Sequence, residues 1–116
     1  MIRSDVRVWL AGSPLDMRKG FDTLAEAVRT VLELDPLSGH LFVFRSRDAH
    51  RVKILWWDQN GYCIYCKRLE RGTFLFPDFG ELSRTAVDGP GDRRKIAIDS
   101  ASLMKLLGGC VIQSRG

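Results

Sequence analysis

The sequence predicts an α+β fold built as one domain across residues 1–116. One N-terminal segment repeats its apolar residues every three or four positions, as an amphipathic helix does, and several short segments carry the apolar runs typical of strands. Most of the strand-like segments follow one another through short connections, which favours a meander with its helices on one face. We therefore expect an antiparallel β-sheet with a central hairpin, one long helix packed on one face, and a short C-terminal helix.

The first two elements are a short strand and the long helix. Residues 7–11 are expected to form the strand, which the Gly-Ser-Pro sequence at 12–14 ends. From Phe21 to Leu32, apolar residues fall on one side of a helix and charged residues on the other. The helix should end near Asp35-Pro36, because proline disfavours helical geometry in the residue before it.

The middle of the chain predicts three strands. Leu41–Phe44 is a continuous apolar run, which suits a central strand buried on both faces. Val52–Trp57 and Tyr62–Leu69 flank Asp58–Gly61, whose Asp in first position and Gly in last are typical of a turn. These segments predict a hairpin, and both a two-residue and a three-residue loop fit its turn.

The C-terminal third predicts one more strand and helix. An aromatic segment, with Phe74, Phe76, Pro77 and Phe79, forms either an edge strand or a packed loop, and residues 85–94 form a mobile connector. Lys95–Ile98 is expected to be the last strand. Asp99 or Ser100 then caps a helix that Gly108-Gly109 stops, and residues from about 109 to 116 form a frayed tail.

Composition bears on location and on redox state. No stretch approaches the roughly 18 consecutive apolar residues of a membrane span, and Met1–Asp5 does not begin a secretory signal. The three cysteines, Cys63, Cys66 and Cys110, are too few for a secreted disulfide framework. We expect a cytoplasmic protein with reduced thiols and no membrane partner.

The positive charge is concentrated in one stretch. The net charge is +4, from 18 basic and 14 acidic residues. All of this excess falls between positions 45 and 71, which points to a polyanion such as DNA. Alternation along the hairpin places basic side chains on both of its faces. The basic residues of this stretch are Arg45, Arg47, Arg51, Lys53, Lys67, Arg68 and Arg71.

Two further basic residues, Arg18 and Lys19, precede the long helix, where backbone N–H groups can help to bind phosphate. The nine residues together are the candidate nucleic-acid-binding set. A plainer interpretation is also open: the arginines pair with local carboxylates, Arg18 and Lys19 are solvated charges, and Trp56 and Trp57 pack the core.

Catalytic and metal chemistry are not predicted. Cys63 and Cys66 have CxxC spacing, but residues three apart in a strand point to opposite faces. We expect two buried thiols and no metal site. The carboxylates Asp16, Asp22, Asp58 and Asp99 are scattered, and no nucleophile or phosphate-loop motif occurs. The sequence therefore predicts a protein that is not an enzyme and has no cofactor.

Four blocks carry a family resemblance: Pro14–Asp22, Asp35–Phe44, Lys53–Asp58 and Lys67–Phe74. In this order and spacing, within about Val8 to Pro77, they resemble the Orf2-like (TnpB) accessory proteins of the insertion sequence 66 family of bacterial transposable elements. The resemblance implies a protein encoded beside a separate large transposase. It also implies a role in assisting transposition, with the strand-transfer chemistry carried by the large partner.

Two functions are compatible with these features. In the first, the chain is a non-catalytic factor that binds DNA, expected to be the element ends, or the transposase–DNA complex through its basic residues. In the alternative, it is an adaptor that binds the transposase or other proteins of the same element without touching DNA. Its surface would then be Trp56, Trp57 and the phenylalanines from Phe74 to Phe79.

Overall fold

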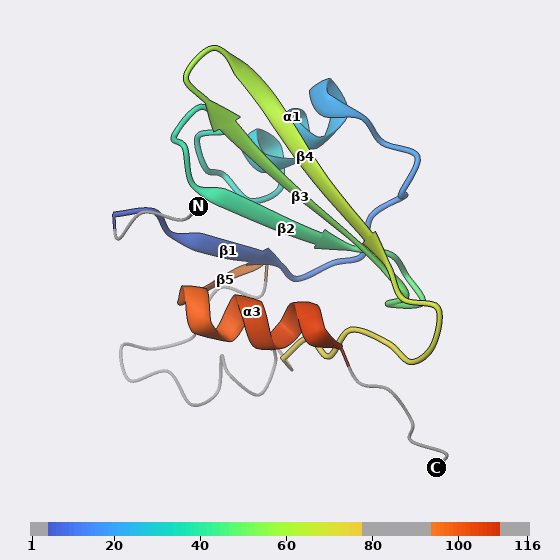
Figure 1. The fold of residues 1–116 in the computed structure, drawn as a ribbon. Helices are drawn as coiled ribbons and strands as arrows, with labels where there is room; N and C mark the ends of the chain where they lie inside the picture. Colours follow the sequence, from blue (N-terminus) through green and yellow to red (C-terminus); the bar gives the residue numbers. More distant parts are fainter. Residues whose placement is uncertain (1–4, 78–93, 110–116) are drawn as a thin grey trace.

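The computed structural model describes residues 5–77 and 94–109 and contains a five-stranded sheet with a helix on each face (Figure 1). The strands lie in the order β4-β3-β2-β1-β5. No helix in the described ranges is long and apolar enough to cross a bilayer. In chain order the elements are β1 (Val8–Ala11), α1 (Phe21–Thr30), β2 (Leu41–Arg45), β3 (Arg51–Asp58), β4 (Gly61–Arg68), β5 (Lys95–Ile98) and α3 (Ser100–Gly108).

The sheet is mixed, so the expectation of a purely antiparallel sheet is wrong. β1 and β2 pair in parallel, with Val8 opposite Leu41, whereas all other neighbours are antiparallel. Parallel neighbours need a long crossover connection, and α1 supplies it between β1 and β2. The expected meander is present in β2-β3-β4, and β5 joins the sheet beside β1.

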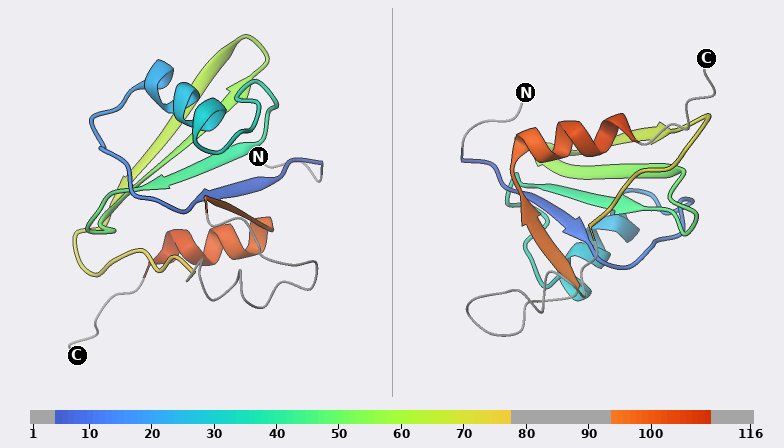
Figure 2. Two further views of the ribbon diagram at one scale, coloured as in Figure 1. Left: turned by 180° about the vertical axis from the view of Figure 1, so that it is seen from behind. Right: turned by 90° about the horizontal axis from the view of Figure 1, so that it is seen from below.

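The helices also differ from expectation. α1 has ten residues and is no long helix, and α3 has nine. α1 ends early because the backbone turns at Glu33, whose φ is 57°, while the Leu34 N–H donates to the carbonyl of Val28. The two helices cover opposite faces, not one face (Figure 2). Because the central strands carry apolar side chains on both faces, each face of the sheet must be buried under a helix.

We refer to the two sides of the sheet as the α1 face and the α3 face. Alternation along β3 sends Leu55 to the α1 face, where it packs with Leu24 and Phe42, and sends Ile54 to the α3 face with Leu103. The α1 core holds Ala11, Leu24, Ala25, Val28, Leu32, Phe42, Phe44 and Leu55. The α3 core holds Val8, Leu10, Val43, Val52, Ile54, Phe74, Leu103 and Leu106.

The predicted hairpin is confirmed, and its loop has two residues. Asp58 lies opposite Gly61, so that Gln59 and Asn60 form the turn, with Gln59 at a φ of 53°. Next to the turn, the rings of Trp57 and Tyr62 meet edge to face with centroids 5.0 Å apart.

The described C-terminal elements match their prediction closely. Asp99 caps α3 by accepting a hydrogen bond from the Ser102 N–H, and Gly109 ends it with a φ of 70°. The positive φ of Gly109 favours glycine, and a Cβ there would lie 2.6 Å from a terminal methyl of Leu69, which would have to move. The aromatic segment is a packed loop whose Phe74 is buried. Phe79, residues 85–93 of the expected connector and the tail from 110 lie outside the described residues.

Candidate nucleic-acid interface

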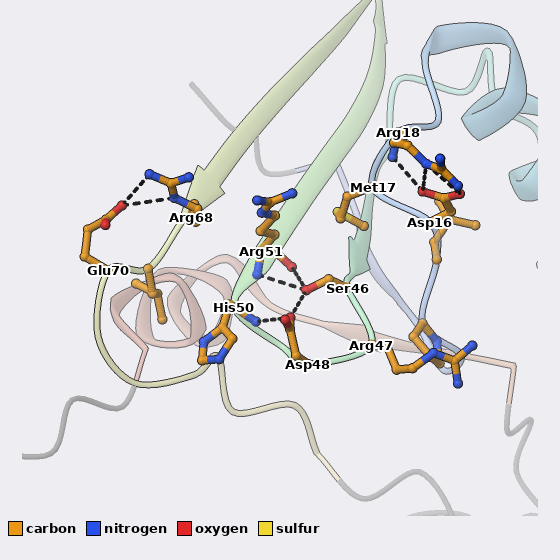
Figure 3. Close-up of a pocket in the computed structure, with 13 residues that line it drawn as sticks. Asp16, Met17, Arg18, Ser46, Arg47, Asp48, His50, Arg51, Arg68 and Glu70 are labelled. Carbon is orange, nitrogen blue, oxygen red and sulfur yellow. Dashed lines mark hydrogen bonds and ion pairs between the residues drawn. The ribbon is translucent and has the colours of Figure 1, made fainter.

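An open cleft of about 820 Å³ lies at the end of the β3–β4 hairpin away from its turn (Figure 3). We call it the arginine cleft. Three chain segments build it: the segment before α1, the β2–β3 loop, and the last residues of β4 with those that follow. Its charged and polar lining is Asp16, Arg18, Ser46, Arg47, Asp48, His50, Arg51, Arg68 and Glu70.

Strand register brings these segments together. Arg51, the first residue of β3, lies directly opposite Arg68, the last residue of β4. The Leu15 N–H donates to the carbonyl of Arg45 at 2.8 Å, which holds the segment before α1 against the end of β2. Arginines far apart in the sequence therefore share one opening.

The β2–β3 loop is fixed by Asp48. Its Oδ1 accepts hydrogen bonds from the Ser46 hydroxyl at 2.8 Å and from the His50 N–H at 3.1 Å. The Arg51 N–H in turn donates to the Ser46 hydroxyl oxygen at 3.1 Å. The His50 N–H, followed by the Ser46 hydroxyl, lowers the pKa of Asp48. This carboxylate therefore serves the loop backbone and stands in no ion pair with Arg47 among the described residues.

The four cleft arginines fall into two classes. Arg18 forms an ion pair with Asp16, Nη2 to Oδ2 at 2.8 Å, and Arg68 pairs with Glu70 at 2.9 Å. The hydrogen bond from Arg18 holds the pKa of Asp16 well below its ordinary value. Within residues 5–77 and 94–109, neither Arg47 nor Arg51 has a carboxylate within ion-pair distance. The cleft thus presents two uncompensated guanidinium groups between two compensated ones.

Lys53 and Lys19 lie beside the cleft. A second depression, lined partly by Lys53, Met17 and Arg51, adjoins it. The Lys53 Nζ donates to the carbonyl of Lys19 at 2.7 Å, which ties β3 to the residue before the N-cap of α1. No carboxylate in the described part of the chain forms an ion pair with Lys53. Its hydrogen bond to the Lys19 carbonyl fixes the position of its charged Nζ.

The remaining predicted residues lie elsewhere. The Arg45 guanidinium stands 5.5 Å from the ring centroid of Phe76, in a cation–π contact. Arg71 is exposed and is not part of the cleft lining. Lys67 points to the α3 face, where its Nζ donates to the carbonyl of Leu107 at 2.8 Å, in the last turn of α3. A cation there stabilises the negative end of the helix dipole.

His50 and Asp48 are cleft residues that the sequence analysis did not select. The His50 Nδ1 lies 2.8 Å from the carbonyl of Gly72 and must donate, because a carbonyl oxygen can only accept. The Ser-Arg-Asp sequence at 46–48 could have indicated this loop, because Ser and Asp side chains commonly accept hydrogen bonds from backbone N–H groups two residues later. The other histidine, His40, accepts a hydrogen bond from the Arg7 N–H through Nδ1.

The two CxxC cysteines lie on opposite faces, as their strand position predicts. Cys63 is opposite Trp56, on the α3 face, and Cys66 is opposite Lys53, on the α1 face. The expectation that both thiols are buried is wrong: Cys63 is half-buried and Cys66 is exposed, because β4 is the outermost strand. No group of three His, Cys, Asp or Glu side chains in the described ranges is placed to hold a metal ion.

An apolar groove of about 450 Å³ lies on the α3 face, between the hairpin and α3. We call it the aromatic groove; its exposed apolar side chains are Tyr65 and Met104, with half-buried Trp56 beside them, whereas the Trp57 ring lies on the α1 face against Tyr62. Phe74 is no part of this surface, because it is 2% exposed and packs in the α3 core. The surface expected for a protein adaptor is therefore centred on the hairpin and α3.

Comparisons with known proteins identify one family and two uncharacterized relatives. A family model described as IS66 Orf2 like protein matches residues 6–115. An uncharacterized protein of Sinorhizobium fredii, y4hO, is 43% identical over 105 residues, which cover 90% of this chain and 81% of the relative. Another from the same organism, y4jC, is 38% identical over 72 residues, 62% of each chain. No solved structure matches the chain.

Proposed function

Because the chain belongs to the IS66 Orf2-like family, we propose that it is a non-catalytic accessory factor of bacterial transposition that contacts DNA through its arginine cleft. The DNA is that of the element ends, free or held by the transposase, and the protein acts in the cytoplasm. Membership of the family supports the link to transposition. The choice of DNA as the direct partner comes from the cleft.

The observation that carries the proposal is the pair of uncompensated guanidinium groups, Arg47 and Arg51. A guanidinium binds a phosphate through two parallel N–H···O bonds, so it suits a nucleic-acid backbone. Contacts of this kind fix a protein's position on DNA without reading sequence. Arg18 and Arg68 at the rim can add to the contact by exchanging their carboxylate partners for phosphate.

The states of the cleft carboxylates support a non-catalytic role. Enzymes that cut and join DNA use carboxylates to hold two metal ions. Here Asp16 is bound by Arg18 and Glu70 by Arg68, while Asp48 accepts hydrogen bonds within its own loop. Each of these carboxylates has a structural partner, which supports assigning the strand-transfer chemistry to the transposase.

The alternative is an adaptor that binds the transposase and never touches DNA. The aromatic groove favours it, because Met104 is 65% exposed and Tyr65 is 42% exposed beside half-buried Trp56. Aromatic side chains commonly anchor protein interfaces. Salt separates the two functions, since phosphate contacts release counterions and apolar contacts do not.

The test measures binding of the purified chain to a labelled duplex by fluorescence anisotropy. The duplex carries an element end, a shuffled duplex is the control, and both are titrated at several salt concentrations with and without the transposase. We expect affinity that falls steeply with salt. If no salt-dependent DNA binding occurs under either condition, the adaptor function takes its place.

A further inference from the structure

The outer edge of β4 is an unpaired strand edge. β4 has eight residues, and no second strand pairs with its outer edge within residues 5–77 and 94–109. Proteins usually protect such edges with proline, with charges along the strand, or by keeping the strand short. β4 contains no proline, and its charges, Lys67 and Arg68, sit at one end only.

We propose that a second copy of this chain pairs with that edge, antiparallel, to form a symmetric dimer with one continuous ten-stranded sheet. The proposal is independent of DNA binding, because it rests on the hydrogen-bonding groups, side chains and charges of β4 and on the apolar surface beside it.

The hairpin register identifies the backbone groups that face outward. Asp58 and Gly61 close a two-residue loop as a hydrogen-bonded pair, and the pairs then alternate along the ladder. Every second residue of β4 therefore turns its N–H and C=O away from β3. These residues are Tyr62, Ile64, Cys66 and Arg68, and their groups are left to water or to another strand.

One symmetric register satisfies all four of these residues within the strand. It places Tyr62 opposite the partner's Arg68, and Ile64 opposite the partner's Cys66. Shifting the two strands by two residues in one direction would place Arg68 opposite the partner's Asn60, which lies in the turn. Shifting them in the other direction would place Tyr62 opposite the partner's Glu70, which lies beyond the end of β4. In the favoured register, the two-fold axis passes beside Tyr65.

The side chains at that axis give a second, independent reason. Tyr65 lies on the α3 face, is 42% exposed, and borders the aromatic groove with Met104. In the dimer, the two Tyr65 residues form a non-hydrogen-bonded pair, in which Cα atoms stand only about 4.5 Å apart. Aromatic pairs in this position stabilise antiparallel strands. The exposed apolar surface beside β4 would thus be covered by its own copy.

The charge distribution favours a second copy in antiparallel orientation. Lys67 and Arg68 face uncharged residues, the partner's Cys63 and the partner's Tyr62. The two Arg68 positions lie six residues apart along the joined strands, about 20 Å at roughly 3.3 Å per residue. A parallel arrangement would instead stack the cationic ends of both strands against each other.

The first experiment measures molar mass by light scattering or sedimentation over a range of protein concentrations. We expect a dimer for the wild-type chain. Tyr65→Glu and Tyr65→Lys should each be monomeric, because like charges meet at the axis, and an equal mixture of the two should recover the dimer. Leu75→Glu makes the same type of change at another exposed apolar residue and should stay dimeric. Circular dichroism confirms that each variant is folded.

The second experiment fixes the register by cross-linking. In a background with Cys63→Ser, Cys66→Ser and Cys110→Ser, Tyr65→Cys should form an interchain disulfide on mild oxidation, since the expected Cα separation falls in the range of about 4.4–6.8 Å. Ile64→Cys in the same background should not, because it faces position 66. A monomeric wild type, a dimeric Tyr65→Glu variant, a mixture that stays monomeric, or equal cross-linking at both positions would each overturn the proposal.

Discussion

Replacing both uncompensated arginines of the cleft, Arg47→Ala with Arg51→Ala, should flatten the salt dependence of DNA binding. Neither guanidinium has a carboxylate to compete for it in the described chain, so each is free to neutralise one phosphate. Each neutralised phosphate of a duplex contributes about −0.9 to the slope of log affinity against log salt, so the slope should change by about 1.8. When salt is raised from 50 to 200 mM, the double variant should therefore lose roughly tenfold less DNA affinity than the wild type.

The assay is anisotropy on the element-end duplex, and the control is matched in charge. Arg7→Ala with Lys105→Ala also removes two positive charges that have no carboxylate partner in the described residues, one before β1 and one in α3, and neither residue lines the cleft. This control should lower overall attraction slightly and leave the slope nearly unchanged. Both double variants should keep the wild-type melting temperature, because exposed charges contribute little to stability.

The result that would refute the reasoning is an equal change in slope for both double variants. It would mean that DNA responds to net charge and not to the cleft. Arg18→Ala and Arg68→Ala serve as an internal comparison. Each residue already has a carboxylate partner, so each should change the slope by less than one of the uncompensated arginines does.

Three other substitutions test the fold away from the cleft lining. Lys67→Gln should lower the melting temperature yet leave the DNA salt slope unchanged, because its Nζ stabilises the Leu107 carbonyl at the end of α3. Leu55→Ala, in the α1 core, should lower the free energy of unfolding in urea by about 2–5 kcal/mol. The Ser102 hydrogen bonds lower the pKa of Asp99 in the folded state, so its contribution is present above its ordinary pKa of 3.8 and is lost as pH falls below that value. An Asp99→Ala variant should therefore lose less stability than the wild type in acid melts.

Local patterns predicted the elements of this fold well. The Asp58–Gly61 turn, the strand Lys95–Ile98 and the cap at Asp99 each depend on a few neighbouring residues and are present in the structure. The end of α1 was missed because Leu32 continues the apolar spacing from a non-helical turn and still packs in the core. Apolar spacing reports which side chains are buried, and not whether the backbone between them is helical.

The partners of strands and charges could not be predicted in the same way. The parallel pairing of β1 with β2 depends on how α1 packs, and this leaves no trace in either strand's own sequence. The basic residues were selected as one group, but their partners divide them. Lys67 stabilises the end of α3. Arg18 and Arg68 form ion pairs with carboxylates, whereas Arg47 and Arg51 form none in the described residues. The Lys67 contact joins residues 40 apart, which composition cannot reveal, whereas Asp16 and Glu70 each lie two residues from their arginine, as the plainer interpretation of the sequence allowed.

The placement of β1 between β2 and β5 has a consequence for synthesis on the ribosome. β1 is synthesised before β2, β3 and β4, but its antiparallel neighbour β5, which pairs Ile98 with Val8, is synthesised after all of them. Until then, one edge of β1 is open, and the apolar side chains that α3 will cover are exposed to water. The β2-β3-β4 meander has only short connections and can form as soon as it has emerged. Folding should therefore pause at a four-stranded intermediate, and a chain truncated after Pro77 should populate that intermediate and aggregate.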